Sequence, residues 1–236
     1  LPLLKLLCPI EENLKRFVEV KRVYGREQLI ERFHEYGIIK RQGPDYPDGF
    51  LLKSGLRSDI YINIRDLIRF PSVFNFAMHV LWQLVDTYYD RRLKDPCIIG
   101  IPTMGAAIAP IIAYKRSNRL VVIRQSKRDH GIGKALEGDI TPNIILIDDV
   151  VTSGSSIQET IDNYIEPALG KKYNLSVFVI VDRREKIESD FKLYSLATLE
   201  EIKKFDPQLC RGNKLDGYEM CDGTISSYSS CHPKKQ

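Results

Sequence analysis

The sequence has no long apolar run, little net charge and few cysteines, and each absence excludes a class of protein. No apolar run approaches the roughly 20 residues that a membrane-spanning helix needs. Lysine plus arginine exceed aspartate plus glutamate by only 35 − 31 = 4, too few to indicate binding to nucleic acid or to an anionic membrane. Five scattered cysteines, odd in number, make no disulfide framework. We therefore expect a cytoplasmic protein with neither nucleic acid nor membrane as a partner.

The two ends of the chain carry little information. Residues 1–24 are rich in leucine, but Pro2 and Lys5 interrupt them and no cleavage-site pattern follows, so we interpret them as an N-terminal extension without a targeting signal. Residues 206–236 contain three cysteines and a histidine but no C-x-x-C pair. We interpret this segment as a largely disordered tail rather than a zinc site.

The stretch IILIDDVVTSGSSI, residues 144–157, is the most informative part of the chain. Its first four residues are apolar and β-branched or leucine, as is typical of a strand buried on both faces of a parallel sheet. Asp148 and Asp149 follow, and then a loop of small, hydroxyl-bearing residues. Beyond the loop, isoleucines recur at helical spacing at positions 157, 161 and 165. The pattern predicts a strand, two acids at its end, a loop and a helix.

This arrangement suits a phosphorylated sugar. The start of a helix offers free backbone N–H groups and the positive end of its dipole, and a Gly/Ser/Thr loop can wrap closely around a phosphate there. Two neighbouring carboxylates can accept hydrogen bonds from both hydroxyls of a ribose diol. The alternative is a capped helix after a core strand, with both acids solvated, and for any one feature alone we would prefer it. The stretch lacks the patterns of a nucleotide P-loop and of a dinucleotide fold. The combination favours a ribose 5-phosphate site.

Apolar runs alternate with helical patterns along the chain, which predicts an α/β fold with a doubly wound parallel sheet. The predicted strands are residues 97–101, 120–124, 144–148 and 176–182, and the predicted helices between them are 71–92 and 105–116. Ligands bind such sheets beyond the carboxyl ends of the strands. The two acids and the loop after Ile101 should therefore lie at the same edge.

The segment QSKRDHGIGKALEGD, residues 125–139, is a polar connection between two predicted strands. It carries the cationic or titratable residues Lys127, Arg128, His130 and Lys134. Connections of this length are usually functional lids or disordered segments. Taken alone, it fits a mobile hairpin tip as well as a lid. Because it follows a predicted anion site, we favour a lid whose cations neutralise developing charge and exclude water.

The central stretch resembles the phosphoribosyl diphosphate (PRPP) motif of type I phosphoribosyltransferases. Three further segments narrow the resemblance to orotate phosphoribosyltransferases, especially the transferase half of UMP synthase. They are LLKSGLRSDIYINIRDL (51–67), the D-H-G lid and VDRRE (181–185). The resemblance covers residues 25–205, and it implies one catalytic domain with a small N-terminal hood region.

The resemblance also implies the reaction and its residues. Orotate would displace pyrophosphate from PRPP, with Mg²⁺ bound mainly through PRPP and no dedicated protein metal site. The catalytic residues would be Lys127, Arg128, His130 and Asp149. Orotate would contact Lys53, Tyr61, Ile62, Thr152 and Arg183. PRPP would contact Thr103, Met104, Arg124, Gln125, Arg128, His130, Asp148, Asp149, Val150, Val151, Thr152, Ser153, Gly154, Ser155 and Ser156. In this family the lid reaches the neighbouring subunit's site, which implies a homodimer.

The chain departs from the family pattern at three site positions. Gln125 and Arg128 stand where the family usually has lysines, and Met104 stands where bacterial members often have lysine but eukaryotic bifunctional enzymes do not. Lys127 could take over the role of the missing lysine in the lid. Two alternatives therefore stay open: a non-catalytic PRPP-binding regulator, and a phosphoribosyltransferase for another base.

Overall fold

The computed structural model describes residues 23–51, 57–124, 135–184 and 191–205. By its contacts the chain divides into two units, residues 1–205 and 206–236, and the described residues all belong to the first. Residues 1–22 of the predicted N-terminal extension, Lys53, the lid from Gln125 to Lys134, the last residue of the VDRRE segment and the C-terminal tail therefore lie outside the described residues.

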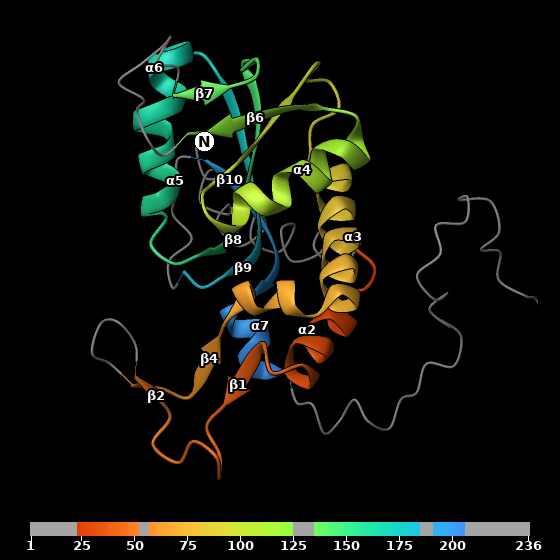
Figure 1. The fold of residues 1–236 in the computed structure, drawn as a ribbon, viewed down its shortest axis with the longest axis vertical. Coiled ribbons are helices and arrows are strands. Elements are labelled where there is room, and N and C mark those ends of the chain that lie inside the picture. Colours follow the sequence, from red (N-terminus) through yellow and green to blue (C-terminus); the bar gives the residue numbers. More distant parts are fainter. Residues whose placement is uncertain (1–22, 52–56, 125–134, 185–190, 206–236) are drawn as a thin grey trace, which may run out of the picture. The chain divides into compact units, whose positions relative to one another are not determined.

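A six-stranded sheet forms the centre of the domain, in the order β10-β9-β8-β5-β6-β7 (Figure 1). Its strands are β5 (Cys97–Gly100), β6 (Arg119–Ile123), β7 (Leu136–Glu137), β8 (Asn143–Val151), β9 (Asn174–Asp182) and β10 (Lys192–Thr198). All pairings are parallel except β6 with β7. The doubly wound parallel sheet is confirmed, and its four predicted strands are present. The edge strands β7 and β10 were not predicted.

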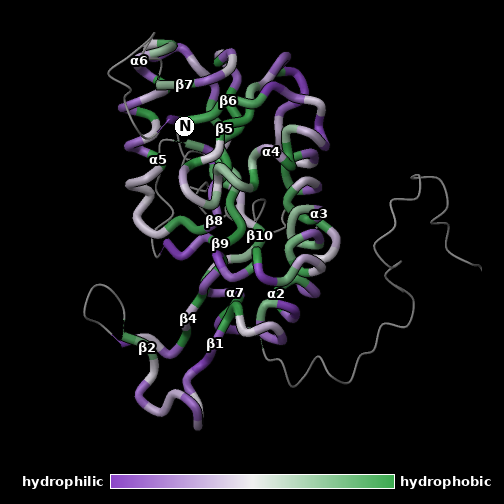
Figure 2. Tube along the Cα trace, in the orientation of Figure 1, coloured by the Kyte–Doolittle hydropathy of each residue, from purple (hydrophilic) through white to green (hydrophobic). Residues whose placement is uncertain are grey.

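Helices cover both faces of the sheet, so β8 is buried on both sides as predicted. On one face lie α3 (Pro71–Tyr88) and α4 (Met104–Arg116), and on the other lie α5 (Ser155–Thr160), the π-helical turn η2 (Ile161–Ile165) and α6 (Glu166–Leu169) (Figure 1). Ile145 and Ile147 of β8 pack in the first core cluster, while Ile144 and Leu146 pack in the second. The strands are accordingly hydrophobic along most of their length (Figure 2). This alternation is what the pleat of a strand dictates.

Helix α3 ends four residues before its predicted end at Arg92. The Asp90 carboxylate accepts a hydrogen bond from the backbone N–H of Arg92, at 3.0 Å. Such a local turn competes with a further helical turn. The predicted end of the helix was wrong because the apolar spacing stops at Tyr88, whereas the residues from Asp90 to Arg92 favour a turn.

The N-terminal part of the domain forms the small hood. It contains α2 (Arg26–Glu35) and two short antiparallel pairs, β1 (Ile39–Arg41) with β4 (Ile60–Ile62) and β2 (Phe50–Leu51) with β3 (Arg57–Ser58). The 3₁₀ helix η1 (Ile64–Arg69) then leads into α3 and contacts β8. The last helix, α7 (Leu199–Lys204), begins with a capping box between Thr198 and Glu201.

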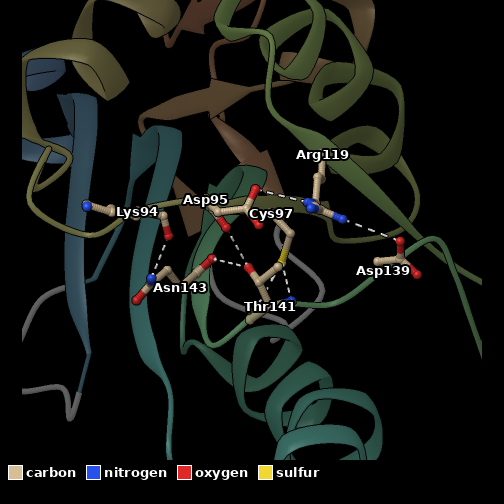
Figure 3. A network of polar contacts seen from close by, with 7 residues as sticks. All are labelled: Lys94, Asp95, Cys97, Arg119, Asp139, Thr141 and Asn143. Carbon is tan, nitrogen blue, oxygen red and sulfur yellow. Dashed lines mark hydrogen bonds and ion pairs between the residues drawn. The ribbon is translucent and has the colours of Figure 1, made fainter.

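At the amino ends of the strands, polar groups bond to one another (Figure 3). Arg119 Nε donates to Asp95 at 2.9 Å, and Thr141 Oγ1 donates to the Asp95 carbonyl at 2.9 Å. The backbone N–H of Thr141 donates to Cys97 Sγ at 3.4 Å, and the Asn143 amide donates to the Lys94 carbonyl at 2.8 Å. The network joins the starts of β5, β6 and β8.

Candidate active site

The acid pair lies inside the last part of β8. The predicted strand ended at Asp148, but Val150 and Val151 continue to pair with Val181 and Asp182 of β9. Asp148 is only 7% exposed, whereas Asp149 is half-buried. The backbone N–H of Asp149 donates to Asp148 Oδ1 at 2.9 Å. Two neighbouring carboxylates are therefore held at the carboxyl end of the central strand.

Burial raises the pKa of Asp148 to about 8, and the charge of Asp149 and a side-chain hydrogen bond with it act in the same direction. The Asp149 N–H and the positive charge of Arg65 oppose the rise. The neutral form of this carboxyl is thus favoured more than in an exposed aspartate. A ligand that donates hydroxyl groups to the pair, or that brings a cation, would favour its ionised form.

Two glycines bring the loop after β5 against the acid pair. A Cβ on Gly105 would lie 2.3 Å from the Ile147 carbonyl oxygen and 3.2 Å from the Asp148 Cα, and one on Gly100 would lie 2.2 Å from the Gly105 carbonyl oxygen. Only glycine permits this backbone approach. Thr103, two residues before Gly105 in this loop, is exposed. Met104 is 6% exposed and belongs to the core, so its side chain does not line an open site.

The predicted loop and helix follow β8 as expected. Gly154 adopts a left-handed conformation with φ of 85° and directly precedes α5. Val151 is buried and Val150 half-buried, while the hydroxyl residues Thr152, Ser153, Ser155 and Ser156 are exposed. Ser153 Oγ accepts from the Ser155 N–H at 3.3 Å and donates to Ser155 Oγ at 3.1 Å. An exposed hydroxyl loop at the start of a helix suits an anionic group of a ligand.

Two consecutive arginines after β9 have different surroundings. Arg184 forms a bidentate ion pair with Asp182, with hydrogen bonds of 3.0 and 2.8 Å. Arg183 Nε is buried and has no hydrogen-bond partner among the described residues. The Arg183 N–H donates to the Val151 carbonyl at 2.8 Å, which fixes this residue beside the loop. A buried donor without a partner is costly unless a ligand satisfies it.

Tyr61 and Ile62 were both expected to shape a pocket for the base, but they point to opposite sides of β4. Tyr61 is 39% exposed, and its ring stacks on Phe50 with centroids 5.5 Å apart. Ile62 is 8% exposed and packs in the core. Phe50 was missed because a single aromatic in a Gly- and Pro-rich segment gives no periodic signal.

Arg124, expected to contact PRPP, forms an ion pair with Glu137 of β7 at 2.5 Å. Its backbone N–H donates to the Ala135 carbonyl at 3.0 Å. These contacts fix both ends of the segment that was interpreted as a lid. The lid residues Gln125, Lys127, Arg128 and His130 lie outside the described residues.

Arg65 was not selected from the sequence, although it lies in the YINIRDL segment. It is exposed on η1, and its charge opposes the raised pKa of Asp148. The spacing of the apolar residues could have indicated its position. In a 3₁₀ helix, residues three apart share a face, so the buried Ile64 and Leu67 place Arg65 on another face.

The described residues contain no group of three or more His, Cys, Asp or Glu side chains that could hold a metal ion. The acid pair offers two carboxylates, which suits Mg²⁺, because this ion commonly binds through one or two carboxylates, substrate phosphates and water. In the same part of the chain, no helix is both long and apolar enough to cross a membrane.

Comparisons with known proteins agree with this geometry. Residues 69–209 match the phosphoribosyl transferase domain family. Orotate phosphoribosyltransferase of Pyrococcus abyssi is 30% identical over 188 residues, which cover 75% of this chain and 94% of that protein. Uridine 5'-monophosphate synthase of Bos taurus is 31% identical over 160 residues, which cover 65% of this chain but 32% of that protein.

Solved structures give the same result. The crystal structure of orotate phosphoribosyltransferase from Aeropyrum pernix is 27% identical and has a TM-score of 0.57, and the match covers 78% of this chain and 99% of that one. Leishmania donovani UMP synthase shares the fold, with 23% identity, a TM-score of 0.57 and 38% of that chain covered. With the acid pair, the hydroxyl loop and the doubly wound sheet in place, the chain belongs to the type I phosphoribosyltransferase family.

Proposed function

We propose that this chain is an orotate phosphoribosyltransferase, which converts orotate and PRPP to orotidine 5'-monophosphate and pyrophosphate in UMP biosynthesis. The observation that carries the proposal is Arg183: its Nε is buried without a hydrogen-bond partner in the described part of the chain, and its backbone N–H bonds to the loop that follows the acid pair. A guanidinium is a forked donor that suits the carboxylate of orotate. The names of the relatives support the same base.

The described residues suggest how the substrates would be held. Asp148 and Asp149 would accept the two ribose hydroxyls, and the loop from Thr152 to Ser156 would surround the 5'-phosphate. Arg183 would receive the orotate carboxylate, and the exposed face of Tyr61 and Phe50 would contact the planar ring. The protein would thus act mainly by positioning the substrates and by stabilising charge.

The remaining parts of the site are proposed from the resemblance. Lys53 would approach the pyrophosphate and the orotate ring, and Lys127, Arg128 and His130 would cover the leaving pyrophosphate. Magnesium, bound mainly through PRPP, would supply neutralising charge at the diphosphate.

We also propose a homodimer in which each lid completes the neighbouring site. Mixing subunits inactivated separately by Arg128→Ala and Asp149→Asn should restore part of the activity, because one site of each mixed dimer would be intact. Absence of recovery would contradict shared sites.

A non-catalytic PRPP-binding regulator is the second candidate, and the residues Gln125 and Arg128 in the lid favour it. The two candidates differ in one assay. Loss of orotate absorbance on adding PRPP and magnesium, with uracil, adenine and hypoxanthine as parallel acceptors, would identify the enzyme and its base. Of these four bases, we expect turnover only with orotate. PRPP binding without turnover of any base would favour the regulator, and turnover of another base would reassign the substrate.

A further inference from the structure

The 3₁₀ helix η1 has three faces with different environments. Ile64 and Leu67 are buried on one face, and Asp66 forms an ion pair with Arg69 on the second, with 4.0 Å between the charged atoms. Arg65 lies on the third face with Ile68, and both are exposed. Arg65 forms no hydrogen bond or ion pair with another of the described residues. The positive charge of Arg69 is therefore neutralised by a neighbouring acid on the same helix, whereas that of Arg65 is not.

The uncompensated charge lies on an element that packs against the strand carrying the acid pair. Helix η1 packs against β8, and Arg65 contributes the positive charge that acts on Asp148. Arg69, four residues along the same helix, is paired with its own neighbour instead. The position of η1 is fixed by Ile64 and Leu67 in the core and by the Asn63 N–H, which donates to the Ile38 carbonyl at 2.9 Å. Arg65 is thus a cation on a rigid support, within electrostatic range of Asp148 yet not bonded to it.

We propose that Arg65 is a substrate-binding residue of this site, and that its guanidinium receives an anionic oxygen of a ligand held by Asp148 and Asp149. The inference rests on the proposed function and names a residue that the function did not require. An arginine that served only to neutralise the acids would form an ion pair with one of them. An exposed, unbonded guanidinium in this position is instead available to a phosphate or a carboxylate, for which its donor geometry is suited.

Two sources of anionic oxygen share this chemistry: the phosphoryl groups of PRPP and the carboxylate of orotate. Calorimetric titration can separate them, with inorganic pyrophosphate in the presence of magnesium, ribose 5-phosphate and orotate as individual probes. Pyrophosphate has no diol, so its affinity does not depend on hydroxyl contacts with the acid pair. A loss that appears with pyrophosphate therefore does not arise from weakened hydroxyl contacts with Asp148 and Asp149.

The variants are Arg65→Gln, which removes the charge, and Arg65→Lys, which keeps the charge without the fork. Arg69→Gln is the matched control, since it removes an arginine from the same helix. We expect Arg65→Gln to weaken at least one probe by about tenfold to a hundredfold, the usual range for a charge-assisted hydrogen bond. Arg65→Lys should restore part of this loss, and Arg69→Gln should change every affinity less than about twofold.

Two results would overturn the inference: unchanged affinities for all three probes in Arg65→Gln, or equal losses in Arg69→Gln. Failure of the proposed function gives a different signature, because it is seen in the unmodified protein. A wild-type chain that binds the probes but turns over no orotate would refute the proposed reaction, while the Arg65 comparison would still be decided. A wild-type chain that binds none of the probes would refute both.

Discussion

The two ends of the central sheet treat their polar groups in opposite ways. At the amino ends of β5, β6 and β8, Arg119, Asp95, Thr141 and Asn143 bond to one another or to neighbouring carbonyls (Figure 3). At the carboxyl end of β8, a carboxyl is buried beside a second one, and the Arg65 guanidinium and Arg183 Nε lack such partners among the described residues. The polar groups drawn at the amino ends have partners within the protein, whereas some of those at the carboxyl end would gain partners only from a ligand.

The difference shows where the fold carries an energetic cost. A buried polar atom without a partner costs about 1–3 kcal/mol, and a buried carboxyl costs more when ionised. Such groups are tolerated where a ligand supplies the missing partners, as expected at the carboxyl ends of the strands in this kind of sheet. Substitutions at the two ends should therefore have different consequences: loss of activity at one, and small losses of stability at the other.

Asp149→Asn should give the largest effect, because it removes one of the two carboxylates proposed to hold the ribose. Turnover of orotate should fall by about a hundredfold to a thousandfold, as for loss of one preorganised group in an active site. Asp95→Asn is the control at the amino end, where it breaks an exposed ion pair with Arg119. It should leave turnover unchanged and lower the free energy of unfolding by less than about 1 kcal/mol. Similar turnover in both variants would contradict the comparison.

Arg183→Gln should have the next largest effect. The KM for orotate should rise by about tenfold to a hundredfold, because a charge-assisted hydrogen bond to the orotate carboxylate would be lost. The variant's free energy of unfolding should stay the same or rise, since Nε has no partner in the part of the chain that the structure describes. Steady-state kinetics and urea unfolding measure the two quantities. A destabilised variant with an unchanged KM would assign Arg183 a structural role.

Gly105→Ala should damage the fold itself. Its Cβ would lie 2.3 Å from the Ile147 carbonyl oxygen, a backbone atom that cannot move without shifting β8. We expect a loss of about 1–3 kcal/mol in the free energy of unfolding, as is usual for overpacking, together with displacement of Asp148. Gly43→Ala is the control, because no atom lies within 4 Å of its added Cβ. Urea denaturation of both variants checks the prediction, which an unperturbed Gly105→Ala would contradict.

The sequence was sufficient to predict the centre of the sheet but not its edges. Hydrophobic runs such as 144–147 mark buried strands, because both faces must be apolar. Strand β7 has only two residues and a single partner, so pairing with β6 rather than composition determines it. Strand β10 lies at the other edge of the sheet, and its residues Lys192, Tyr194 and Thr198 are exposed or half-buried. Apolar periodicity carries no information about such pairings.

The candidate site was predictable in part for a related reason. Asp148, Asp149 and the hydroxyl loop are contiguous, so one motif identified them. Contacts between distant segments were not accessible: the ion pair of Arg124 with Glu137 and the position of Arg65 beside β8 depend on how elements pack. The opposite orientations of Tyr61 and Ile62 follow from the strand period once β4 is known, but three residues are too few to indicate a strand in the sequence.

The last expected effect is a pH dependence of stability that belongs to the carboxyl end alone. The pKa of Asp148 is about 8 in the folded chain, against an ordinary value of 3.8. Between these values the folded state binds more protons than the unfolded state, so the free energy of unfolding should fall as the pH rises, by at most about 1.4 kcal/mol per unit. Asp148→Asn, which resembles the protonated acid, should lose this dependence, whereas Asp95→Asn should keep it. Urea unfolding of the three proteins between about pH 4 and about pH 8 measures the difference between their curves. Parallel curves for wild type and Asp148→Asn would mean that the buried carboxyl ionises at no cost, and that the two ends of the sheet do not differ in the way described.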